Sequence, residues 1–180
     1  MVKILNFVLY NLAWFACVLS LGAPERWWWG PAAVAPVVIW HLLASDHWRR
    51  DAVAIALASA LGPVIDTVLL NAGLIHLPAS VQQPLGWLPP GPMWLLWPAF
   101  ATLFYCSLRW ITDRYLLLAA CSLVGGPMAY FTASNLVAGF GFGPGLWPAL
   151  ALIGVIWALG LPAMLYLINR VNRGIWPAAV

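Results

Sequence analysis

Long apolar runs, separated by short polar or turn-rich joints, make up most of this chain. The runs cover approximately residues 4–22, 28–44, 52–75, 93–111, 115–136 and 146–168. Most are near the roughly 20 residues that an α-helix needs to cross the hydrocarbon core of a bilayer. The pattern therefore predicts an all-α fold: a polytopic membrane helix bundle with six transmembrane helices.

The composition agrees with this prediction. Hydrophobic residues make up 64% of the chain and charged residues only 7%, whereas a soluble domain carries about 25% charge. A chain with so few charges could not cover a water-facing surface. We therefore expect a single integral-membrane domain over residues 1–180, with no soluble domain appended.

Charge asymmetry predicts the orientation. If the N-terminus is cytoplasmic, Arg26 alone lies outside, and the other seven basic residues lie at inner ends: Lys3, Arg49, Arg50, Arg109, Arg114, Arg170 and Arg173. An excess of basic residues is typical of cytoplasmic loops, so both termini are predicted to be cytoplasmic. Basic residues at the ends of spans also make nucleic acid an unexpected partner. Arg109 and Asp113, four residues apart, predict an interfacial ion pair.

The third and fifth runs share a spacing of a Gly-Pro pair, a polar residue three positions after the proline, and an amide five positions further on. The matching residues are Gly62, Pro63, Asp66 and Asn71 against Gly126, Pro127, Tyr130 and Asn135. The fourth and sixth runs both open on a Trp-Pro-Ala segment, at residues 97–99 and 147–149. We interpret this as a tandem hairpin repeat (spans 3–4 and 5–6), the kind of repeat that builds membrane bundles with sites at the repeat interface. Chance is the alternative, because the chain has 15 Gly and 15 Pro.

Asp66 is the only charged residue in the run 52–75. An ionisable group at membrane depth is costly and is usually retained for a function. Asp66 is separated from the joint at Asp51 by 14 residues, roughly 20 Å along a helix that rises 1.5 Å per residue, hence in the outer half. Tyr130 has a comparable depth, and its phenol could donate a hydrogen bond to the carboxylate.

We therefore expect a ligand-binding or proton-carrying site near the outer face, with Trp residues at its mouth. Its candidate residues are Asp66, Tyr130, Asn71, Asn135, Trp94 and Trp97. Gly62 and Gly73 are expected on the same side of the helix as Asp66, where small residues allow close packing. The alternative is that Asp66 only holds helices together through interhelical polar contacts.

Most of the 13 Trp residues lie near the ends of runs and are interpreted as interfacial anchors, with a Trp-lined ligand pocket as the alternative.

Catalytic and metal-binding motifs are missing from the sequence. It has no H-E-x-x-H pair and no phosphate-binding glycine loop. Cys17, Cys106 and Cys121 lie inside apolar runs without C-x-x-C spacing. We therefore expect neither a cofactor nor a metal, and the balance is against an enzyme without settling the matter.

An ordered set of short motifs resembles a known family. The set consists of Asn6 with residues 14–19, Gly30-Pro31, His41-Leu42, Gly62 with Asp66, residues 92–102, Ser107-Leu108, and residues 125–127 with Tyr130. It is similar to an uncharacterised bacterial inner-membrane family, domain of unknown function 2878. The resemblance implies a small multi-span protein of the bacterial inner membrane with no assigned activity. Members are encoded near lipid-modifying proteins, so it also implies, by analogy, a link to membrane lipid metabolism.

These observations lead to one expectation and two alternatives. We expect a lipid- or apolar-ligand-binding or accessory protein of the inner membrane. The alternatives are a small proton-coupled transporter that uses Asp66 and an intramembrane lipid-modifying enzyme. The expected partners are the lipid bilayer, a bound lipid or apolar ligand, and another membrane subunit or a second copy of the chain.

Overall fold

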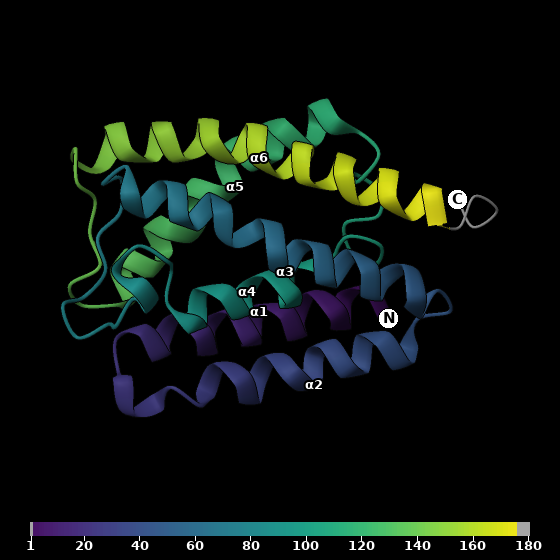
Figure 1. Ribbon diagram of the computed structural model, residues 1–180, viewed down its shortest axis with the longest axis horizontal. Coiled ribbons are helices and arrows are strands. Elements are labelled where there is room, and N and C mark those ends of the chain that lie inside the picture. Colours follow the sequence, from purple (N-terminus) through teal and green to yellow (C-terminus); the bar gives the residue numbers. More distant parts are fainter. Residues whose placement is uncertain (1, 176–180) are drawn as a thin grey trace.

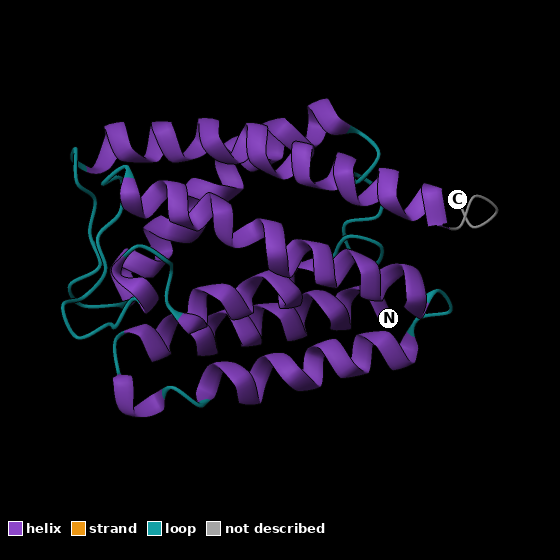
Figure 2. Ribbon diagram, viewed as in Figure 1, coloured by secondary structure: helices purple, strands orange, loops and turns teal. Residues whose placement is uncertain are grey.

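The computed structural model describes residues 2–175 and shows an all-helical chain (Figure 1). Its helices are α1 (Val2–Leu21), α2 (Trp29–Ala44), α3 (Trp48–Asn71), α4 (Gly91–Ala101), α5 (Tyr115–Leu136) and α6 (Leu146–Ile175), with short 3₁₀ turns at Pro24–Arg26 and Pro84–Gly86. Within residues 2–175 the extended pairing is limited to one isolated bridge between His76 and Gly141. Figure 2 shows the same helices joined by loops at the two ends of the bundle. The all-α prediction is confirmed.

Four of these helices, α1, α3, α5 and α6, are long and apolar enough to cross a membrane. The other two differ from the expected runs. α2 has 16 residues, and α4 has 11 and ends at Ala101, well short of the run that extends to residue 111. The six-span count, the sidedness of the termini and the hairpin repeat therefore stay predictions.

The second half of the fourth run is a turn-rich segment, residues 102–113. Pro98 lies inside α4 and has no N–H to donate, and the next three backbone bonds, from residues 102, 103 and 104, close tight i to i+3 turns. Leu103 and Phe104 are fully buried. Non-helical backbone is tolerated in an apolar surrounding where protein encloses it, and the buried first part of this segment, residues 102–104, meets that condition.

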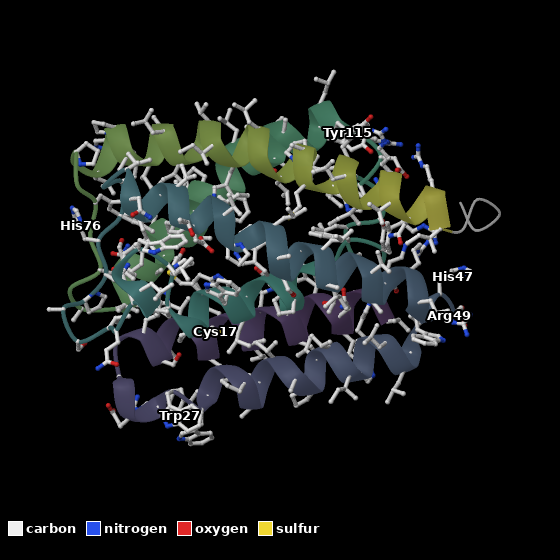
Figure 3. The ribbon with its side chains drawn as sticks, viewed as in Figure 1. Cys17, Trp27, His47, Arg49, His76 and Tyr115 are labelled. Atoms are coloured by element: carbon white, nitrogen blue, oxygen red, sulfur yellow. The ribbon has the colours of Figure 1, made fainter. Side chains whose placement is uncertain are left out.

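The helices form two groups with α3 between them (Figure 1). α5 pairs with α6, α1 packs against α2 and α4, and α3 contacts both α4 and α6. α1 and α5 barely touch, so the bundle is loosely closed between them. The N-terminus and the described end of α6 lie at the same end of the bundle as His47 and Arg49, and His76 and Trp27 lie at the opposite end (Figure 3).

Two expectations at the ends of the helices are wrong. Asp113 lies 3.8 Å from the guanidinium of Arg173 on α6, and no ion pair joins it to Arg109 among the described residues, because the chain around Asp113 is a turn and lacks the helical spacing that would align the two. Gly73 lies beyond the end of α3 with φ +65°, where it ends the helix and presents no packing face.

Candidate functional site

Asp66 is buried, with 4% of its surface exposed, on α3, where side chains from α4 and α5 reach it. Both of its carboxylate oxygens accept a hydrogen bond. The phenol of Tyr130 donates to Oδ1, and Nε1 of Trp97 donates to Oδ2 over 2.7 Å. Asp66 makes no salt bridge with any residue from 2 to 175. The carboxylate is thus held by neutral donors and is not compensated by a cation.

Two glycines allow the aromatic rings to reach this position. Gly62 lies four residues before Asp66, on the same face of α3, and a Cβ atom there would overlap the indole of Trp97. Gly126 stands in the same relation to Tyr130 on α5, and its missing side chain admits the indole of Trp157 from α6. The two indoles stack, with ring centroids 5.4 Å apart and planes 18° apart. Four helices therefore converge on one carboxylate.

A cavity of about 70 Å³ adjoins this cluster. Asp66 is the only charged side chain among its lining residues, and the other walls are apolar or aromatic: Tyr10, Trp14, Val18, Leu21, Met93, Leu96, Trp97, Phe100, Ala129, Tyr130, Ala133, Phe140 and Trp157. Nε1 of Trp157 is buried next to the Tyr130 ring and makes no hydrogen bond of normal geometry with the described residues. The cavity therefore offers an acceptor, Asp66, and a free donor, Trp157. We call it the Asp66 pocket.

A larger groove of about 620 Å³ runs between α1 and α5. It shares Tyr10, Trp14, Phe100, Ala129 and Trp157 with the Asp66 pocket, so the two spaces adjoin. Its outer lining includes Phe7, Phe15, Trp110 and Met128, all of which are exposed on the side of the bundle. The groove is therefore open at the side of the bundle and borders the Asp66 pocket. We call it the lateral groove.

The structure brings together three of the six candidate residues: Asp66, Tyr130 and Trp97. Trp97 is 3% exposed and contacts the carboxylate, so it lies deeper than the expected mouth of the site. Asn71 is exposed and donates to the carbonyl oxygens of Thr67 and Trp87. Asn135 is exposed and donates to Phe131 within its own helix. Trp94 does not line the pocket. For these last three residues a ligand role stays a prediction without a contact to the Asp66 pocket.

Sequence reasoning missed Trp14, Trp157, Tyr10 and Phe100. A signal was present for both tryptophans. Each lies near the middle of an apolar run, whereas an interfacial anchor would lie near an end. An indole deep in a span needs a partner or a cavity for its N–H, as Trp157 illustrates.

A second polar cluster lies at the end of the bundle that holds the start of α1 and the end of α6, and sequence reasoning missed it as well. Asp51, read as part of a polar joint, is 3% exposed. It accepts from Ser45 Oγ at 2.6 Å and from Arg50 at 3.2 Å, and lies 3.1 Å from His41 Nε2. The Arg50 guanidinium lies 4.2 Å from the centre of the Tyr105 ring. The charges of this cluster are paired with one another, and its contacts hold α2, α3 and the segment 102–113 together.

A helical bundle with four helices suited to crossing a membrane, enclosing a single carboxylate in an apolar pocket, is typical of integral membrane proteins. The chain belongs to the family described as "Protein of unknown function (DUF2878)", whose model matches residues 3–163. The match includes Asp66, Trp97, Tyr130 and Trp157 and confirms the family expected from the sequence. No curated protein and no solved structure matches the chain.

Proposed function

We propose that this protein is an integral membrane protein that binds a lipid or another apolar ligand in the Asp66 pocket. The observation that carries the proposal is that this pocket adjoins the lateral groove, with five side chains lining both. An apolar chain lying between α1 and α5 would place its polar end beside Asp66 and Trp157. Ligand sites are commonly mostly apolar, with a few polar groups that fix orientation, and this arrangement has both.

The apolar part of such a ligand contributes little to selectivity. A chain that moves from the bilayer into the lateral groove leaves one apolar surrounding for another, so the hydrophobic effect that drives burial from water is nearly absent. Selectivity then rests on the polar end, where Asp66 and Trp157 are the groups available. This makes Asp66 a recognition group, in addition to a contact between helices.

Native mass spectrometry after gentle purification tests this proposal. Ala129 lies where the pocket meets the lateral groove, so Ala129→Phe should block the ligand. Ala120→Phe makes the same change at an exposed position of α5 that lines neither space. We expect a bound mass on the wild type and Ala120→Phe and its loss from Ala129→Phe. A wild type without any bound mass in several mild detergents would contradict the proposal, as would equal occupancy of Ala129→Phe.

Proton-coupled transport through Asp66 is a second candidate, favoured by the lack of a cation partner for this carboxyl among the described residues. This transport hypothesis predicts, in reconstituted vesicles, proton movement that depends on a ligand and disappears in Asp66→Asn. If the wild type shows no such movement, transport is excluded and ligand binding is the remaining function. The lining of the pocket does not favour an enzyme. It brings together one carboxyl, two phenols and three indoles, and it holds no pair of a nucleophile and a general base.

We further propose a bacterial inner-membrane location with six crossings and both termini in the cytoplasm. The support is the distribution of basic residues along the chain, together with the start of α1 and the end of α6 lying at the same end of the bundle (Figure 1). A fluorescent protein or phosphatase fusion at each terminus tests this directly. Fluorescence of both fusions, with no phosphatase activity from either, is the expected result.

A further inference from the structure

Charge is the property of the Asp66 pocket that most restricts its ligand. We propose, resting on the proposed function, that the ligand is a lipophilic cation: a quaternary or protonated amine whose charged nitrogen lies beside Asp66 and whose apolar part lies in the lateral groove. The proposal names the class of ligand and goes beyond the apolar binding argued above. It stands on the charge, the donors and the walls of the pocket.

The pocket carries one negative charge and no positive one. Asp66 is its only charged lining residue, and no described basic residue forms a salt bridge with it. The partly buried guanidinium of Arg50 forms a salt bridge with Asp51 and borders a different cavity. A phosphate or carboxylate head group would therefore meet an uncompensated like charge, which disfavours it. A cation supplies the counter-charge that the described residues lack.

Burial in an apolar pocket disfavours the ionised form of Asp66, and the hydrogen bonds that the carboxylate accepts oppose this effect. Tyr130 and Trp97 each direct a donor at a different carboxylate oxygen, and donors of this kind stabilise the charged state. Each carboxylate oxygen offers about two acceptor positions, so one position on each oxygen is left for a ligand. A protonated amine can donate to it, and a quaternary ammonium can approach it as a point charge.

The other walls of the pocket are suited to a cation. Six aromatic side chains line it in addition to Phe140: Tyr10, Trp14, Trp97, Phe100, Tyr130 and Trp157. Phe100 stands nearly perpendicular to Trp97, at 77°, and at 67° to Trp157, so rings border the space in more than one direction. Aromatic faces attract cations, and cages of such rings bind quaternary ammonium groups. Trp157 leaves its N–H unpaired, which suits an ester or ether oxygen near the charged nitrogen.

The size of the pocket is consistent with a small head group. One buried water needs about 10–15 Å³ of such space. The pocket, at about 70 Å³, therefore takes a group the size of about five waters. A trimethylammonium group is of this order. The chain attached to it would leave through the shared boundary at Ala129 into the lateral groove.

Three probes with the same ten-carbon chain test the inference: decyltrimethylammonium, decanol and decyl sulfate. Binding to the full chain in lipid nanodiscs is followed by tryptophan fluorescence, with empty nanodiscs as the blank. We expect the cation to bind at least tenfold more tightly than decanol and decyl sulfate not to bind. In Asp66→Asn the preference for the cation should fall at least tenfold, while Asp113→Asn, which removes an exposed carboxylate outside the pocket, should keep it.

The outcomes separate this inference from the proposed function. If the wild type bound decanol as tightly as the cation, the cation inference would be overturned and apolar binding would stay in place. Binding of decyl sulfate more tightly than the cation would have the same consequence. Binding of none of the three would overturn both. The wild-type comparison decides the matter even if Asp66→Asn does not fold, because all three probes are compared on one protein.

Discussion

Replacing Gly62 by alanine adds one methyl group at the point where α3 meets the indole of Trp97. A Cβ there overlaps the ring, so the indole or the helix must move. Overpacking of this kind costs about 1–3 kcal/mol. Displacing the indole also breaks its 2.7 Å hydrogen bond to Asp66, and a hydrogen bond to a charged group contributes about 1.5–3 kcal/mol. The two effects share one displaced ring and do not add fully, so we expect a loss of about 2–5 kcal/mol.

The assay is unfolding in mixed micelles, with SDS titrated against a mild detergent. Gly125→Ala is the matched control, because a Cβ at Gly125 meets nothing within 4 Å and alanine favours helix over glycine. The control should be as stable as the wild type or more so. Gly62→Ala should also weaken binding of the decyltrimethylammonium probe, since the ring it moves lines the Asp66 pocket. Unchanged stability of Gly62→Ala, with probe binding intact, would refute the close packing of Trp97 on α3.

Three further changes have defined outcomes. Tyr130→Phe removes a donor from a buried carboxylate and should lower the free energy of unfolding by about 1.5–3 kcal/mol, measured by the same SDS titration; a loss below 0.5 kcal/mol, on the order of an ordinary surface change, would contradict the site geometry. Asp51→Asn leaves Arg50, only 13% exposed, without its charge partner and should cost about 3 kcal/mol in the same SDS titration. Asp113→Asn should leave the stability unchanged, and equal losses in the two variants would contradict the pairing of Asp51 with Arg50. Asn71→Ala, at an exposed position outside the pocket, should leave probe affinity unchanged, and a tenfold loss would restore Asn71 to the site.

Hydropathy alone predicted where most of the helices lie, because apolar runs in a chain with few charges form helices that satisfy their own backbone. It could not predict the end of α4. Residues 102–111 are largely apolar and partly buried, as a span would be, and their irregular backbone depends on tertiary partners. Asn6 of α1 is one such partner, donating to Thr102 over 3.2 Å and accepting from Ser107 over 2.6 Å. Contacts about 100 positions apart in the chain leave no local pattern.

The meeting of Asp66 with Tyr130 was predictable, since counting residues from a charged joint gives depth and both lie on helices that begin at the same end. The depth of Trp97 could not be predicted from the sequence. Pro89 and Pro90 are already buried, so the chain enters the protein before α4 begins and carries Trp97 inward. Asn71 follows Asp66 by five positions, as Asn135 follows Tyr130. Five positions correspond to about 140° around a helix of 3.6 residues per turn, and the structure places Asn71 at the surface.

Photocrosslinking tests the central claim most directly, because it reports where a ligand lies. A decyltrimethylammonium analogue with a diazirine at the end of its chain is irradiated with the protein in nanodiscs, and labelled peptides are mapped by mass spectrometry. The account predicts labelling of the lateral groove at residues such as Phe7 and Met128, which Ala129→Phe abolishes and Ala120→Phe preserves. Labelling spread evenly over lipid-facing positions such as Leu116, 90% exposed, and unaffected by Ala129→Phe would contradict it.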